Sequence, residues 1–258
     1  MSSIAGSRII VTGGASGMGA AIVRAFAADG VRVASLDINI EQGRAVVAAA
    51  NDGANGEAAF FACDVADKPN VELAMGEARD WLGGLETVIH AAGVAPGAPA
   101  ESITLDAWDT VMAVNARSTF LVNQAAFGFL RETGGRILNF ASGAGVSGLV
   151  NKAHYSASKG AVIAWTRTVA KEWGQYGITV NAIAPAINTP MYARTRSLMT
   201  QAQRDALDAR LKTDMPIDGA LGEADRDLFP VMRFLSSDDA RFMTGQIFAV
   251  DGGLLMVR

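Results

Sequence analysis

The chain has 258 residues, of which 50% are hydrophobic and 19% charged, so it can bury a sizeable core and is not expected to be disordered. A formal net charge of −4 without a basic cluster argues against nucleic acid or an anionic membrane as the main partner. The single cysteine, Cys63, excludes an intramolecular disulfide framework, and no apolar run reaches the roughly 18 to 20 residues needed to span a bilayer. With no apparent secretory signal at the N-terminus, these features predict a cytoplasmic protein.

Short apolar or β-branched runs alternate with helical patterns along most of the chain. Strands are predicted at 8–12, 31–37, 58–64, 86–93, 135–142, 177–185 and 246–253. Helices are predicted at 17–29, from 41, from Pro69 to about 83, and at 104–131, 153–175 and 223–236. The alternation predicts an α/β fold in which helices cover both faces of a parallel sheet, as one domain over 1–258. Segment 186–222 shows no strand pattern and is expected to be an irregular insertion over the sheet edge.

A glycine-rich loop, TGGASGMG, joins the first strand to the first helix. Gly13 permits a tight turn. Gly17 and Gly19 let the backbone approach a pyrophosphate at the helix N-terminus, where free N–H groups favour anions. The spacing is G-x-x-x-G-x-G instead of the commoner G-x-G-x-x-G. A glycine-rich turn without a ligand is the alternative. The predicted cofactor contacts here are Gly13, Ser16, Gly17, Met18 and Gly19.

Asp37 ends the second predicted strand. A carboxylate at this place can bind both hydroxyls of an adenosine ribose and would repel a 2′-phosphate. Neither Ile38 nor Asn39 is basic, and Ser16 stands where the loop would otherwise carry a basic residue. The sequence therefore predicts NAD rather than NADP, although a strand-end Asp without a ligand is the alternative.

Two further strand ends are expected to border the cofactor. Asp64, followed by Val65, can accept a hydrogen bond from the adenine amino group, although a lone strand-end carboxylate is ambiguous. Ala91, Ala92 and Gly93 are small enough for a cofactor to lie against their backbone, but packing alone also explains them.

Three polar side chains form the candidate catalytic set. Tyr155 and Lys159 are four residues apart, which places them on one face of a helix. The usual pKa of a tyrosine, about 10, is too high for a base at neutral pH, and a nearby ammonium would lower it. Ser142 ends the fifth predicted strand, where its hydroxyl can bind a substrate oxygen. A Tyr and a Lys at this spacing are common by chance, so the prediction depends on their combination with the glycine loop and Ser142.

In combination, these motifs resemble the short-chain dehydrogenase/reductase family in its roughly 250-residue form, over essentially the whole chain. The resemblance implies a Rossmann-type, seven-stranded, doubly wound sheet, a homotetramer, and a catalytic tetrad of Asn115, Ser142, Tyr155 and Lys159. It also implies that Asn115 distorts its helix and holds a water that connects Lys159 to solvent. From the residues alone, Asn115 is a polar side chain in an apolar helix, and bonding to a backbone group explains it equally well.

The chain departs from the family pattern in two places. Residues 90–93 read His-Ala-Ala-Gly where the family usually has Asn-Asn-Ala-Gly, and we interpret His90 as a packed strand-end residue and not a catalyst. Thr189 follows Pro185 by four residues instead of five, and Ala186 replaces a glycine. The predicted contacts of the nicotinamide carboxamide are the backbone of Ile187 and the hydroxyl of Thr189, next to Pro185.

The predicted reaction is reversible oxidation of a secondary alcohol to a ketone with NAD, and no metal site is predicted. Segment 186–222 is expected to be a lid whose apolar residues favour a hydrophobic or cyclic alcohol, although packing against the core also explains them. Arg194 and Arg196 are expected to be solvated charges, with a substrate carboxylate as the alternative. For His154, lining the pocket and exposure to solvent both stay open. The candidate pocket residues are Ser142, Gly143, Ala144, His154, Met191 and Tyr192.

Three other functions are alternatives to this one. A 3-oxoacyl-thioester (acyl-carrier-protein) reductase is disfavoured by Asp37, because that role usually takes NADP. A non-catalytic NAD-binding regulator or scaffold would not need Ser142, Tyr155 and Lys159. A sugar epimerase or dehydratase shares Tyr-x-x-x-Lys but has a longer chain. The apolar tail 252–258 is expected to be buried against another subunit.

Overall fold

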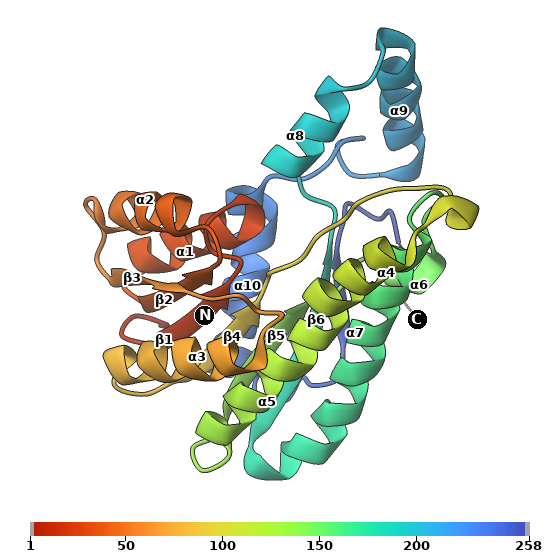
Figure 1. Ribbon diagram of the computed structural model, residues 1–258. Coiled ribbons are helices and arrows are strands. Elements are labelled where there is room, and N and C mark those ends of the chain that lie inside the picture. Colours follow the sequence, from red (N-terminus) through yellow and green to blue (C-terminus); the bar gives the residue numbers. More distant parts are fainter. Residues whose placement is uncertain (1–2, 256–258) are drawn as a thin grey trace.

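A seven-stranded parallel sheet organises the chain in the computed structural model, which describes residues 3–255 (Figure 1). The strand order is β3-β2-β1-β4-β5-β6-β7, and every neighbouring pair is parallel. The strands are β1 (Arg8–Thr12), β2 (Arg32–Asp37), β3 (Glu57–Ala62), β4 (Thr87–His90), β5 (Gly135–Phe140), β6 (Ile178–Pro185) and β7 (Ile247–Val250). The predicted doubly wound, seven-stranded sheet is confirmed.

Helices cover both faces of this sheet (Figure 1). One face carries α1 (Gly17–Ala28), α2 (Ile40–Asn51) and α10 (Phe229–Leu235). The other carries α3 (Lys68–Leu82), α5 (Ser118–Leu130) and α7 (Ala153–Trp173). The remaining α-helices are α4 (Leu105–Val111), α6 (Ala144–Ser147), α8 (Pro190–Ser197) and α9 (Gln201–Asp214).

The core follows from the two-residue repeat of a strand. In β1, Ile9 and Val11 pack with α1 and α2 on one face, while Ile10 between them packs with α3 and α5 on the other. All three are fully buried, because helices cover both faces of a parallel sheet. Alternating side chains of one short strand therefore join the two layers of the core.

Several strands end earlier than the apolar runs predicted. β3 ends at Ala62 and β5 at Phe140, so Asp64 and Ser142 each lie two residues beyond a strand, in loops at the carboxyl edge. β4 ends at His90, so the three residues that follow belong to a loop and not to the predicted strand 86–93. An apolar run continues beyond its strand because the loop behind it is also partly buried. The prediction that Asp64 and Ser142 end their strands is therefore wrong by two residues.

Segment 186–222 was predicted to be irregular, and this prediction is wrong, because the segment contains helices α8 and α9. Both project beyond the carboxyl edge of the sheet (Figure 1). Helix α8 begins at Pro190 after Thr189, whose hydroxyl accepts a hydrogen bond from the Tyr192 amide. Helix α9 begins with a capping box between Thr200 and Gln203. Because α8 and α9 have no buried residue, they lack the apolar stripe on which the prediction depended.

The helix predicted over 104–131 is divided by a π-helical turn, Met112–Arg117, between α4 and α5. A second π-helical turn, Ala224–Leu228, precedes α10. Such turns are rare and occur often at functional sites. Asn115 lies in the first of them and is buried, so the helix distortion that the resemblance implied is present at the implied residue.

Among residues 3–255, no helix combines the length and the apolar character that crossing a membrane requires. The predicted burial of the tail concerns in part residues 256–258, which lie outside the described residues. Within the described part, Leu254 is exposed.

Candidate active site

A cleft of about 400 Å³ lies at the carboxyl ends of β1 to β4, beside the point where the strand order reverses between β1 and β4. This is where open α/β sheets bind ligands. Most of the predicted cofactor contacts line it, namely Gly13, Ser16, Gly17, Met18, Gly19, Asp37, Ile38, Asp64, Val65, Ala91, Ala92, Gly93 and Thr189. Sequence reasoning missed Cys63, Val94, Val114 and Pro190, and it had placed Met191, which also lines the cleft, in the substrate pocket.

The N-terminus of α1 opens into this cleft. Ser16 occupies the N-cap position, but its side chain accepts no capping hydrogen bond, and the first turn holds no acidic residue. The loop is tight: a Cβ on Gly13 would lie 2.7 Å from the Ala92 Cα, and a Cβ on Gly19 would lie 2.1 Å from the Gly13 carbonyl oxygen. Gly19 is therefore required by the loop itself. The uncapped N–H groups fit the pyrophosphate of a dinucleotide.

Asp37 is fixed at the far end of the same cleft. Its Oδ2 accepts a hydrogen bond from the Ala15 amide at 3.0 Å, and its Oδ1 accepts one from the Asn39 amide at 2.9 Å. Each carboxylate oxygen keeps a second lone pair, so the group can also accept from two ribose hydroxyls. The bond to Ala15 ties the carboxylate to the glycine loop and so sets its distance from the N-terminus of α1.

The third strand end contributes a carboxylate and a thiol. Asp64 accepts a hydrogen bond from the Ala66 amide at 2.9 Å and lines the cleft with Val65. Cys63 is buried beside them, and burial, with the negative charges of Asp64 and Asp37, raises the pKa of its thiol to about 12. A thiol with such a pKa is not a nucleophile at neutral pH, so Cys63 contributes only to the shape of the cleft.

Gly93 links the cleft to the predicted catalytic residues. A Cβ on Gly93 would lie 3.2 Å from Asn115 Oδ1 and 3.5 Å from Lys159 Nζ, so both side chains flank this glycine. The Asn115 amide donates to the Val94 carbonyl and to Ser158 Oγ, each at 2.9 Å, and accepts from the Val94 amide at 2.8 Å. The side chain of Asn115 thus bonds the backbone, which is the alternative that the residues alone left open. It does so within the distorted helix that the resemblance implied.

Tyr155 and Ser142 are neighbours, since the two side chains are within hydrogen-bonding reach. Burial raises the pKa of Tyr155 above its ordinary value, and the contact with Ser142 opposes this shift. Lys159 Nζ lies 6.0 Å from the centre of the Tyr155 ring. The sequence predicts a lowered tyrosine pKa, but in the protein alone burial raises it, and Ser142, not the Lys159 ammonium, opposes that shift.

Lys159 is a buried amine without a carboxylate partner among the described residues. Its Nζ donates to the Phe140 carbonyl at 2.6 Å, and burial lowers its pKa to about 8. A desolvated amine with that pKa can hold its proton at neutral pH and release it readily. The residue therefore suits binding to hydroxyl groups and proton exchange.

The other predicted pocket residues lie in different surroundings. Gly143 and Ala144 follow Ser142, and the Ala144 amide donates to Ser142 Oγ at 3.2 Å. Tyr192 is half-buried at the start of α8. His154 is fully buried, so the open alternative of solvent exposure is wrong, and it does not line the cleft.

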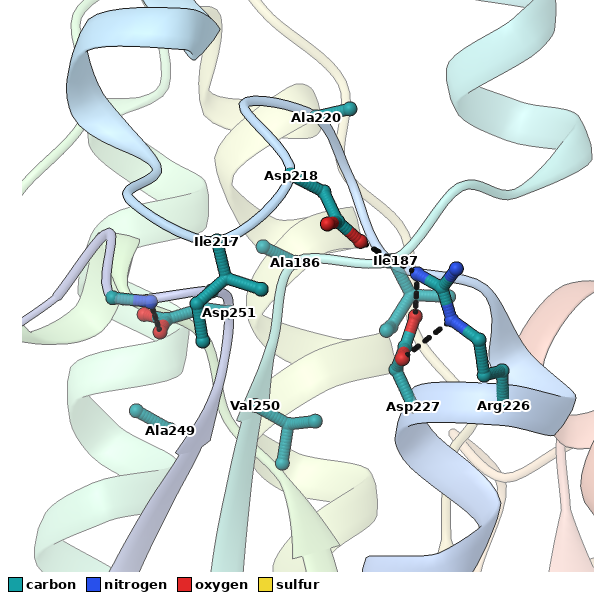
Figure 2. Close-up of a pocket in the computed structure, with 13 residues that line it drawn as sticks. Ala186, Ile187, Ile217, Asp218, Ala220, Arg226, Asp227, Ala249, Val250 and Asp251 are labelled. Carbon is teal, nitrogen blue, oxygen red and sulfur yellow. Dashed lines mark hydrogen bonds and ion pairs between the residues drawn. The ribbon is translucent and has the colours of Figure 1, made fainter.

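Ile187 does not line the cleft with its side chain, and neither does Pro185. Figure 2 shows Ile187 in a second cavity of about 420 Å³, together with Val250 and the ion pairs that Arg226 forms with Asp218 and Asp227. The predicted contact of the Ile187 backbone with the nicotinamide carboxamide stays a prediction.

Arg196, for which a substrate carboxylate was the alternative partner, is engaged within segment 186–222. It pairs with Asp208 through two bonds of 2.6 Å, which tie α8 to α9. Arg194 is exposed, as expected of a solvated charge. Residues 3–255 contain no group of three or more His, Cys, Asp or Glu side chains that would suit a metal ion.

The cleft lies at the switch point, and Lys159 reaches its edge at Gly93, although Ser142, Tyr155 and Lys159 do not line it. A cleft of this kind beside a Ser, Tyr and Lys set is typical of α/β oxidoreductases. Residues 13–255 match the family described as Enoyl-(Acyl carrier protein) reductase. The chain belongs to the short-chain dehydrogenase/reductase family and is an oxidoreductase of that family.

Its relatives include enzymes that act on alcohols. It is 36% identical to D-threitol dehydrogenase of Mycolicibacterium smegmatis, over 96% of this chain and 92% of that protein. It is 37% identical to 2,5-dichloro-2,5-cyclohexadiene-1,4-diol dehydrogenase of Sphingobium indicum, over 100% of both. Among solved structures, levodione reductase superposes with a TM-score of 0.90 at 32% identity, over 96% of this chain and 97% of that one.

Proposed function

We propose that the protein interconverts a secondary alcohol and its ketone, with NAD as the hydride acceptor. The observation that carries the proposal is that Lys159 and Asn115 flank Gly93, which lines the dinucleotide cleft, while Tyr155 and Ser142 lie within reach of each other. A non-catalytic NAD-binding protein would have no use for this arrangement. NAD is favoured over NADP because the Asp37 carboxylate lines the cleft and would repel a 2′-phosphate.

In this mechanism, bound NAD supplies the electrophilic ring that accepts hydride. Ser142 would hold the substrate oxygen, and Tyr155 would take the hydroxyl proton as the carbonyl forms. The half-buried Tyr155 has a raised pKa in the protein alone, so it needs added positive charge to act as a base near neutral pH. Lys159 is the cation nearest to that role, and its own pKa of about 8 lets it lose and regain a proton.

For the substrate, we propose a hydrophobic or cyclic alcohol, ring diols included. The apolar Met191 lines the cleft, and Tyr192 follows it in α8. The relatives named above are a threitol dehydrogenase and a chlorinated cyclohexadienediol dehydrogenase, whose substrates by name are diols or polyols.

The test is a panel of cyclic and linear secondary alcohols with NAD or NADP, followed by the absorbance of the reduced cofactor. We expect turnover with NAD, loss of turnover in Tyr155→Phe, and unchanged NADH binding in that variant. Asp37→Ala should weaken NAD binding and reduce the preference for NAD over NADP. Turnover retained by Tyr155→Phe would refute the catalytic assignment, and reduction of 3-oxoacyl thioesters in place of alcohol oxidation would favour the acyl reductase.

We further propose a cytoplasmic homotetramer in which 186–222 is the substrate lid. Exposed apolar side chains, among them Leu105, Val150 and Phe242, support an assembly larger than a monomer. Light scattering at micromolar concentration would test this, and a mass of about 27 kDa, that of one 26.8 kDa chain, would refute it.

A further inference from the structure

The mechanism leaves His90 unused, although this titratable group is buried beside the cleft. His90, at the end of β4, is 2% exposed and bonds polar side chains with both ring nitrogens. Nδ1 lies 2.7 Å from Thr12 Oγ1, and Nε2 lies 2.9 Å from Ser118 Oγ. Thr12 ends β1 just before the glycine loop, and Ser118 begins α5 just after the π-helical turn of Asn115.

The direction of each hydrogen bond in this group can be assigned. Ser118 Oγ donates to the Val114 carbonyl at 2.6 Å, because a carbonyl can only accept. Its oxygen must then accept from His90 Nε2–H. Burial lowers the pKa of His90 to about 3, so at neutral pH Nδ1 carries no proton and accepts from the Thr12 hydroxyl. Thr12 Oγ1 in turn accepts from the Ala92 amide at 3.4 Å. His90 is therefore neutral with its proton on Nε2.

Both ends of this chain reach the cofactor cleft. Ala92 and Val114 both line it. Ala92 also sets the position of Gly13, since a Cβ on that glycine would lie 2.7 Å from the Ala92 nitrogen. Val114 immediately precedes Asn115 within the π-helical turn. A second hydroxyl bond, from Thr119 Oγ1 to the Asn115 carbonyl at 2.8 Å, holds the exit of the same turn.

We propose that His90 is a positioning residue that fixes the glycine loop and the π-helical turn of Asn115 relative to each other through one directed chain of hydrogen bonds. Each half of the imidazole holds one side of the cleft: Nδ1 the side of Thr12, and Nε2 the side of Ser118. The histidine found where the family usually has asparagine can reach both partners because its two nitrogens lie on opposite edges of one rigid ring.

The proposal rests on the proposed function only where turnover is measured. Two substitutions of His90 separate its bond to Thr12 from its bond to Ser118. An asparagine side chain ends near the position of Nδ1, so His90→Asn keeps an acceptor for Thr12 and loses the bond to Ser118. A glutamine side chain ends near the position of Nε2, so His90→Gln keeps a donor for Ser118 and loses the acceptor for Thr12. Thr12→Val and Ser118→Ala cut the same two bonds from the other side.

The readouts are NADH affinity, amide hydrogen exchange followed by mass spectrometry, and kcat with any alcohol the wild type accepts. We expect His90→Gln and Thr12→Val to raise the NADH dissociation constant about tenfold and to speed exchange in 12–20. We expect His90→Asn and Ser118→Ala to speed exchange in 112–118 and to lower kcat about tenfold, with NADH affinity near that of the wild type.

Thr166→Val is the matched control, because Thr166 is fully buried and accepts a hydrogen bond from Asn139 Nδ2 at 3.0 Å, away from the cleft. It should lower the thermal midpoint without changing NADH affinity or kcat. If the Asn and Gln variants behave alike, or both behave like Thr166→Val, the proposal is overturned. If the wild type oxidises no alcohol, the proposed function fails, while NADH affinity and hydrogen exchange still decide the role of His90.

Discussion

Burial of the neutral His90 ring predicts that the protein loses stability in mild acid. Burial, and secondarily the charge of Lys159, lowers the pKa of His90 from 6.5 to about 3. The unfolded chain therefore binds a proton near pH 6.5 that the folded chain does not bind until about pH 3. The stabilising contribution of the neutral ring is fully present above pH 6.5 and is lost progressively as the pH falls toward 3.

The size of the loss between pH 7 and pH 5 follows from linkage. With a pKa of 6.5 unfolded and about 3 folded, His90 alone reduces the free energy of unfolding by about 2 kcal/mol over this interval. Lys159 adds no slope there, because its folded pKa of about 8 keeps it protonated in both states below pH 7. The interval also lies above the range in which the carboxylates Asp208 and Asp227, whose pKa values are lowered, take up protons.

The measurement is urea unfolding at pH 7 and pH 5 of the wild type and of His90→Asn, at one protein concentration, since assembly makes apparent stability concentration-dependent. The wild type should lose about 2 kcal/mol more than the variant between the two pH values. His154 and all other groups are common to both proteins and cancel in this difference. Parallel losses would show that His90 is not held neutral, and would refute both the tautomer and the directed chain built on it.

Three further outcomes are expected. Gly19→Ala should abolish NADH binding and lower the thermal midpoint, because its Cβ would lie 2.1 Å from the Gly13 carbonyl oxygen. The control Gly128→Ala in α5, whose Cβ would have nothing within 4 Å, should be neutral or stabilising. Equal effects of the two substitutions would contradict this. Asp208→Asn should raise KM severalfold with little change in the midpoint, since it releases α8 from α9; an unchanged KM would argue against a lid. A disulfide reagent at pH 8 should label Cys63 only after unfolding, and rapid labelling of the native protein would contradict its burial.

The sequence was most informative where a short pattern fixes both chemistry and geometry. The glycine loop, Asp37 and the pair Tyr155 and Lys159 could be placed because each lies on or beside a regular element whose period is known. Asp64 and Ser142 were misplaced by two residues, because an apolar run does not distinguish the end of a strand from the buried loop that follows. Both still lie at the carboxyl edge, so the error leaves the chemistry intact.

What the sequence concealed depends on contacts between distant segments. Helices α8 and α9 bury no residue, so the hydrophobic period gives no signal, although Thr200 and Gln203 form a capping box that is readable as a helix start. Val114 carries no chemical signal of its own and reaches the cleft only through the π-helical turn. The interpretation of His90 as packed was right, but its bonds to Thr12 and Ser118 join residues 78 and 28 positions away.

The open N-terminus of α1 means that the folded chain leaves part of its own helix unfinished. Ser16 makes no capping bond, so a nucleotide phosphate arriving there would complete the helix as well as bind to it. Binding would then be measurable as added resistance to unfolding, about 2.7 kcal/mol at a hundredfold excess over the dissociation constant. The folding stability of the protein would in this way depend on the concentration of the nucleotide that it binds.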